Sequence, residues 1–164
     1  MQELQAVMVA YDVVDNALLA QGYKRYMRDY ELLIEAHVGP AEPGTYSYLF
    51  KHCVAANIRT AVPDEIYRES LDDRLPEREV AEHDDRVDGF AWGVGWSMLY
   101  PGWALVTPSE RAEGWTERIG ITFHEMRIAT SAYRIELIFS ELAVTKVSED
   151  LDPGIREVYL ALGE

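Results

Sequence analysis

The chain has 164 residues, of which 48% are hydrophobic and 27% charged, and it contains one cysteine. This composition predicts a single globular domain over residues 1–164 and excludes a disordered chain or an internal disulfide framework. The formal net charge of −14 argues against nucleic-acid binding, because an acidic field repels phosphate backbones.

The first predicted element is a helix over residues 3–21. Gly22 follows it at the position of a left-handed C-terminal cap. The apolar stripe that indicates this helix consists of Leu4, Val7, Met8, Tyr11, Val14 and Leu18.

Residues 30–38 and 46–54 alternate between apolar and polar side chains, and the turn sequence GPAEPG separates them. This pattern predicts an antiparallel hairpin with one buried face. When the two apolar faces are matched, Val38 lies opposite Tyr46 and His52 lies opposite Leu32.

Residues 63–88 are strongly acidic, with eleven acids against four arginines, which is half of the net charge of the protein. We expect a short helix before Pro76 and a solvated loop after it. The acids are Asp64, Glu65, Glu69, Asp72, Asp73, Glu77, Glu79, Glu82, Asp84, Asp85 and Asp88.

Residues 90–100 form the most aromatic stretch of the chain and are predicted to be a strand that ends in the turn Tyr-Pro-Gly. The side chains at alternate positions are small: Ala91, Gly93, Gly95 and Ser97. A core strand needs such one-sided alternation, so we expect the bulky face to be buried, although it could also form a ligand platform. The bulky residues are Phe90, Trp92, Val94, Trp96, Met98 and Tyr100.

A helix is predicted from Thr107, as N-cap, to Gly120, with Pro108 in its first position and Glu110 completing a capping box. Strands are expected over 121–130, 133–140 and 142–148, and Asp152-Pro153 begins a last helix. Short connections and hairpins favour an α+β fold. We predict a single antiparallel sheet of about six strands with three or four helices packed on it.

Several runs resemble the YxiG-like family of small bacterial proteins, and the likeness extends over residues 15–148. The resemblance implies a bacterial cytosolic protein, but no activity and no site residues. The runs are RDYELLIEAHVGP, GTYSYLFKHCV, SLDDR, DGFAWGVGWSMLYPG and FHEMRIATSAYRIELIFSEL.

The sequence contains no GxSxG, Walker or dinucleotide motif and no metal-binding spacing, so we predict no catalytic residues, no metal and no cofactor. In the predicted register, His37 lies about 20 Å from Cys53, too far to activate a thiol. Cys53 is therefore interpreted as an inert cysteine, and His52 and His124 as hydrogen-bonded core histidines. The carboxylates of Asp72 and Asp73 would diverge on a helix, which is the wrong geometry for a shared proton.

Our leading functional hypothesis is a non-enzymatic protein of the inhibitor or immunity type that binds a basic partner protein. Its contact residues would be Asp72, Asp73, Glu82, Asp84 and Asp85. The alternative is a small-molecule-binding protein or enzyme with a cleft beside the aromatic strand; mimicry of nucleic acid is a third hypothesis. The cleft residues would be Trp92, Trp96, Tyr100, Trp103, His52 and His124. We expect a cytoplasmic location, because the sequence has neither a signal peptide nor an apolar run of ~18 residues.

Overall fold

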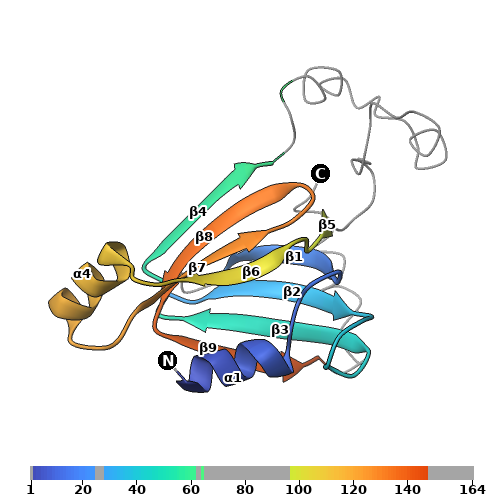
Figure 1. The fold of residues 1–164 in the computed structure, drawn as a ribbon, viewed down its shortest axis with the longest axis horizontal. Coiled ribbons are helices and arrows are strands. Elements are labelled where there is room, and N and C mark those ends of the chain that lie inside the picture. The colour runs from blue at the N-terminus through green and yellow to red at the C-terminus, as the bar shows by residue number, and fades with distance from the viewer. Residues whose placement is uncertain (1, 25–27, 62–63, 65–96, 148–164) are drawn as a thin grey trace.

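The computed structural model describes residues 2–24, 28–61, 64 and 97–147. Within them the chain is mostly β, with two helices and nine strands (Figure 1). The elements are α1 (Gln2–Ala10), β1 (Ala17–Tyr23), β2 (Tyr30–Ala36), β3 (Gly44–Lys51), β4 (Ala55–Thr60), β5 (Ser97–Met98), β6 (Gly102–Val106), α4 (Glu110–Ile119), β7 (His124–Ala129), β8 (Tyr133–Phe139) and β9 (Glu141–Lys146).

The strands form two antiparallel sheets, not the predicted single sheet. Sheet A has the order β5-β1-β2-β3-β9, and sheet B has the order β4-β8-β7-β6. The predicted α+β fold class is therefore wrong. The alternation within a strand shows which face is buried, but it does not show which strands share a sheet.

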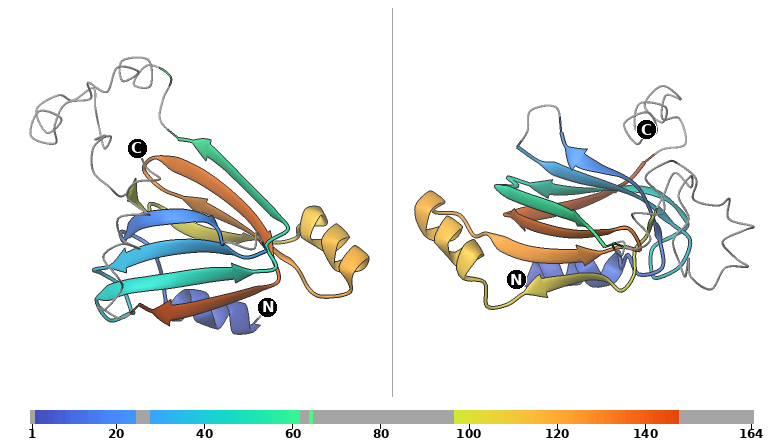
Figure 2. Two further views of the ribbon diagram at one scale, coloured as in Figure 1. Left: turned by 180° about the vertical axis from the view of Figure 1, so that it is seen from behind. Right: turned by 90° about the horizontal axis from the view of Figure 1, so that it is seen from above.

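The two sheets bury their inner faces in one shared core (Figure 2). Leu32, Tyr48 and Phe50 contribute from sheet A, and Met126 and Leu137 from sheet B, all with no exposed surface. Helix α1 adds Leu4 to this core and lies beside β9. No helix in the described part of the chain is long and apolar enough to cross a membrane.

The predicted N-terminal helix is wrong beyond residue 10, because residues 17–23 form strand β1 and Gly22 lies within it. Asp15 lies in the turn between α1 and β1 and has a positive φ of 60°, which is not helical. The Asn16 side chain then holds the turn, because its Oδ1 accepts hydrogen bonds from the backbone N–H groups of His37 and Val38 at 2.8 and 3.1 Å.

The hairpin of β2 and β3 is present, but its register differs from the prediction. Ile34 lies opposite Tyr46, where Val38 was expected, and Leu32 lies opposite Tyr48, where His52 was expected. The shift of four residues keeps the parity, so the predicted apolar faces do enter the core. The pairing ends at Ala36, because residues 37 and 38 bind Asn16 instead.

The chain crosses twice between the two sheets at one corner. Chain segments pass there from β3 to β4 and from β8 to β9, and the second passage uses the single residue Ser140. The backbone N–H of Ser140 donates to the Lys51 carbonyl at 3.0 Å, and that of Val54 donates to the Ile138 carbonyl at 2.9 Å. Residues 46–54 are therefore not one strand, because the chain leaves sheet A after Lys51.

Helix α4 covers one end of the outer face of sheet B, where Ala112 packs with Phe123 and Ile138. Its C-terminal cap is Gly120, as predicted, with a left-handed φ of 82°. The predicted N-cap is wrong by two residues: Ser109, not Thr107, accepts the hydrogen bond from the Ala112 backbone N–H at 3.1 Å.

Of the aromatic stretch, only its end falls within the described residues, and the parity there is the reverse of the prediction. Met98 and Tyr100 are 41% and 62% exposed, whereas Leu99 is fully buried. The two-residue strand β5 pairs with β1 at the edge of sheet A, so Met98 does not face the shared core.

Candidate functional site

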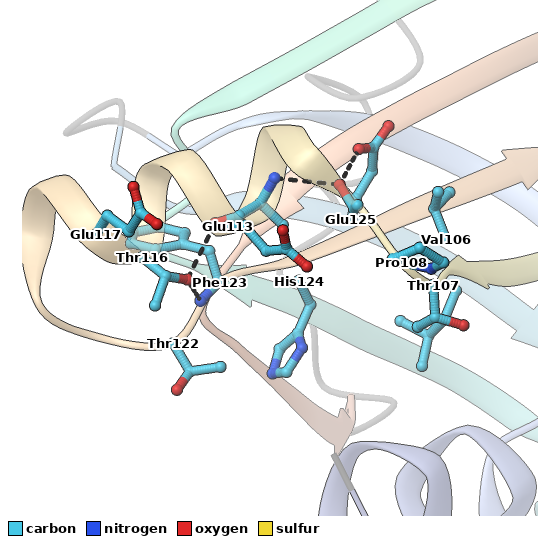
Figure 3. Close-up of a pocket in the computed structure, with 13 residues that line it drawn as sticks. Val106, Thr107, Pro108, Glu113, Thr116, Glu117, Thr122, Phe123, His124 and Glu125 are labelled. Carbon is cyan, nitrogen blue, oxygen red and sulfur yellow. Dashed lines mark hydrogen bonds between the residues drawn. The ribbon is translucent and has the colours of Figure 1, made fainter.

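A pocket of about 470 Å³ opens between α4 and the strands β6 and β7 (Figure 3). Its apolar wall includes Leu105, Val106 and Phe123, and its rim carries the exposed carboxylates of Glu113 and Glu117. None of the described residues that line it is a lysine or an arginine. Such a pocket suits a ligand group with an apolar stem and a cationic head.

The two rim carboxylates lie four residues apart on α4, so they share one face of the helix. Like charges at this spacing destabilise a helix by about 0.2–0.5 kcal/mol. Glu113 extends from α4 toward the region of His124 (Figure 3). A cation bound between α4 and β7 would offset the repulsion between Glu113 and Glu117.

His124 lies at the start of β7, lines the pocket and is half-buried. Its ring centroid is 6.0 Å from that of Phe139. Burial lowers the pKa of His124 from its ordinary value, so the imidazole is neutral at neutral pH. The lining of the pocket therefore includes a neutral hydrogen-bonding ring.

A buried polar cluster fixes the floor of the pocket. Glu125 is only 4% exposed. It accepts hydrogen bonds from the Ser109 hydroxyl at 2.5 Å and from Arg111 Nη1 at 2.9 Å. Since the Ser109 hydroxyl also caps α4, this cluster attaches the helix to β7. The role of Ser109 is structural, because its hydroxyl already binds two groups.

His52 does not belong to this pocket. It follows β3 at the corner of the two sheets, and its Nδ1 lies 2.7 Å from the Ser140 hydroxyl. Its backbone N–H donates to the buried Asp29 carboxylate at 2.9 Å, which holds the positive φ of 49°. His52 therefore does not share a face with Tyr48 and Phe50; it holds the corner.

Tyr100 and Trp103 lie at the opposite end of sheet B from His124. Trp103 pairs with Ile128, four residues along β7 from His124, or roughly 13 Å at the rise of a strand. Trp103 packs edge-on against Tyr48, with ring centroids 5.6 Å apart, and it lines a second pocket beside α1. The four described members of the predicted cleft are therefore not brought together.

Cys53 is buried beside the Tyr23 hydroxyl, and its thiol donates to the Ala55 carbonyl at 3.3 Å. Burial raises the pKa of this thiol above its ordinary value, so it stays protonated at neutral pH. His37 lies at the end of the β2–β3 hairpin opposite Cys53, and its Nε2 is 3.4 Å from Glu35 Oε2. These contacts match an inert cysteine.

The predicted partner-binding acids Asp72, Asp73, Glu82, Asp84 and Asp85 lie outside the described residues, as do Trp92 and Trp96. Their roles in binding a partner or a ligand therefore stay predictions. Among the residues that the structure does describe, no three potential metal ligands are grouped closely enough to hold an ion.

Sequence reasoning missed the pocket beneath α4. The helix was predicted, and so was His124 as a candidate ligand, but Glu113 and Glu117 were not singled out. Their spacing of four residues on the predicted helix was the available signal. Which residues of α4 line the pocket together with His124 depends on how α4 packs on β7, and the sequence pattern does not disclose that packing.

A family model described as "YxiG-like protein" matches residues 1–156. The chain therefore belongs to the YxiG-like family, in agreement with the resemblance seen in its sequence. No curated protein is similar enough to match the chain.

Proposed function

We propose that this member of the YxiG-like family is a non-enzymatic interaction protein that binds a basic partner protein in the bacterial cytoplasm, as an inhibitor or immunity-type protein does. The observation that supports the proposal most directly is the pocket beneath α4, which combines an apolar wall with a rim of carboxylates. Arginine is enriched at the anchor positions of protein interfaces, and its aliphatic stem and cationic head fit this combination.

The acidic segment 63–88 supplies the second part of the proposal. Its eleven acids and four arginines, together with the overall charge of −14, produce a directional negative field. Such a field accelerates the encounter with a basic surface and disfavours acidic partners. The segment steers the partner, and the pocket holds one of its side chains.

A tagged wild-type chain and a matched variant test the proposal by capture from a native bacterial lysate. The variant carries Asp72→Lys, Asp73→Lys, Asp84→Lys and Asp85→Lys. We expect the wild type to retain a basic protein in near-stoichiometric amount and the folded variant to lose it. Retention of the same protein by both chains, or capture of acidic proteins only, would contradict the proposal.

The pocket is tested separately by Glu113→Gln combined with Glu117→Gln. Removal of the repulsion should stabilise α4 by about 0.2–0.5 kcal/mol, and loss of the favourable interaction of Glu113 with the helix N-terminus should offset this gain, so the free energy of unfolding should change by less than about 1 kcal/mol. Binding of the captured partner should nevertheless weaken several-fold. Glu110→Gln is the matched control, because Glu110 lies exposed on the same helix but does not line the pocket.

A small-molecule-binding protein or enzyme is the second candidate, and the neutral imidazole of His124 inside the pocket favours it. A thermal-shift screen of small organic amines distinguishes the two functions. A compound that raises the melting temperature of the wild type but not of His124→Gln would support this candidate. Stabilisation that is the same in both chains would count against it.

A further inference from the structure

The outer face of sheet B carries a cluster of arginines, although the protein as a whole is strongly acidic. Arg59 on β4, Arg127 on β7 and Arg134 on β8 project from this face, beyond the end that α4 covers. Their pairing register places them on the side opposite the core residues Ile135 and Leu137. All three are exposed. We call Arg59, Arg127 and Arg134 the arginine face.

The positive charges of the arginine face are only partly balanced. Arg59 lies directly opposite Arg134 in the ladder, an arrangement that destabilises a sheet. Among the acids that the structure describes, Glu136 lies beside this face; its Oε1 is 3.8 Å from Arg59 Nη2 and 3.8 Å from Arg127 Nε. It is also shared with Arg111, whose Nη1 lies 3.3 Å from Oε2. The single carboxylate of Glu136 is thus shared by the guanidinium groups of Arg59, Arg111 and Arg127.

Guanidinium donors remain available on this face. Arg134 uses Nη1 for the backbone carbonyls of Thr130 and Tyr133. Within the part of the chain that the structure describes, the guanidinium groups of Arg59 and Arg127 lie near Glu136 but beyond hydrogen-bonding distance from it. Their planar forks suit carboxylates, which they bind in a bidentate manner.

The chain enters and leaves the segment 62–96 beside this face. On the way in, the Ala61 backbone N–H donates to the Ala132 carbonyl at 2.8 Å. On the way out, the Met98 carbonyl accepts from the Ser131 N–H at 2.8 Å. Both ends are therefore attached to the turn between β7 and β8, next to Arg134.

We propose that the arginine face binds the acidic segment 63–88 of the same chain. The segment has eleven acids and only four arginines, so it cannot neutralise its own charge. Its attachment at both ends gives its carboxylates an effective concentration on the order of millimolar at the nearby arginines. An acidic group on another molecule lacks this advantage and must overcome the net charge of −14.

This intramolecular contact goes beyond the proposed function, and it affects that function. The carboxylates that contact the arginine face are drawn from the same set that would meet a basic partner. A partner must therefore compete with Arg59, Arg127 and Arg134 for them. The arginine face also selects against weakly basic partners, because such partners compete less effectively with its arginines for the carboxylates of residues 63–88.

Zero-length crosslinking of the protein alone tests the proposal. A carbodiimide joins a carboxylate to an adjacent amine but does not react with arginine. The test variant therefore carries Arg127→Lys and Arg134→Lys, which keep the charge and supply the amine. The control is Arg118→Lys, because Arg118 is exposed at the far end of α4, where it stacks on Trp115 at 3.9 Å.

We expect crosslinks from positions 127 and 134 to residues 63–88, at least about fivefold more abundant than those from position 118. A mixture of isotope-labelled and unlabelled chains should show them within one chain, and they should disappear at about 1 M salt. Crosslinks between two copies, equal amounts from the control position or none from positions 127 and 134 would overturn the proposal. No partner protein is used, so this result is independent of the proposed function.

Discussion

His52 and His124 are both half-buried imidazoles next to a strand end, but their surroundings give them different roles. The His52 imidazole bonds with the Ser140 hydroxyl, and the His52 backbone N–H donates to the Asp29 carboxylate; both contacts hold the corner between the sheets. His124 lines the pocket beneath α4. Residue type and strand periodicity are the same for both, so only the tertiary contacts distinguish the structural histidine from the candidate ligand.

The lowered pKa of His124 predicts a pH dependence of stability. In the unfolded chain its pKa has the ordinary value of 6.5, and burial lowers it in the folded state. The unfolded state therefore binds more protons below pH 6.5, and folding stability falls as the pH is lowered through this range. His124→Gln should make the free energy of unfolding less dependent on pH between about 7.5 and 5.5. Urea denaturation at both pH values measures this. An equally steep dependence in the variant would contradict it.

Cys53 should be chemically silent, because burial raises the pKa of its thiol. We expect a thiol reagent to label it slowly in the native protein at about pH 8 and fully in denaturant. Cys53→Ser should keep partner binding within a few-fold of the wild type. A Thr122→Cys variant in that background provides an exposed thiol as control. Native labelling of Cys53 as fast as labelling of the control would refute the prediction.

At the scale of elements, one hydroxyl both caps α4 and attaches it to sheet B. Ser109 caps the helix and also donates to the buried Glu125 carboxylate. Ser109→Ala should lower the free energy of unfolding by about 2–3 kcal/mol, through loss of the cap and of one buried hydrogen bond. Thr122→Ala, in the exposed loop that follows α4, should change it by less than about 0.5 kcal/mol. Chemical denaturation of the three chains checks this, and a similar small effect for both variants would mean that Ser109 does not hold the helix.

Elements could be predicted best where the sequence pattern was local. Strand alternation identified β2, β3, β7 and β8, and the preference of glycine for the end of a helix identified the cap at Gly120. The first helix was overextended, because Val14 and Leu18 fit a helical stripe as well as a turn followed by a strand. The low helix propensity of Asp15 and Asn16 was the available warning.

The arrangement of the sheets was beyond the reach of periodicity. Ser140 alone separates β8 in sheet B from β9 in sheet A, and nothing in its identity shows that the chain changes sheets there. Likewise, the predicted strand 46–54 hides the corner at His52, because its apolar alternation continues through Val54. The candidate site depends on these same long-range contacts, which explains why only His124 of its residues was anticipated.

At the scale of the whole molecule, charge is distributed unevenly. Residues 63–88 carry half of the net charge, while Arg59, Arg127 and Arg134 gather on the outer face of sheet B. A protein selected only for solubility would gain more from dispersed charges. The concentration of acids in one segment instead favours an account in which electrostatics select a partner.

Surface-captured binding kinetics with the captured basic partner test this account most directly. The wild type is compared with the variant that carries Asp72→Lys, Asp73→Lys, Asp84→Lys and Asp85→Lys, each at two salt concentrations. Exposed charges are screened beyond about 10 Å at 0.1 M salt. We predict an affinity at least about tenfold weaker in the variant, mainly through a slower on-rate, and a similar loss for the wild type at high salt. An unchanged on-rate in the folded variant, or an affinity indifferent to salt, would contradict the account and reduce the acidic segment to a solubility feature.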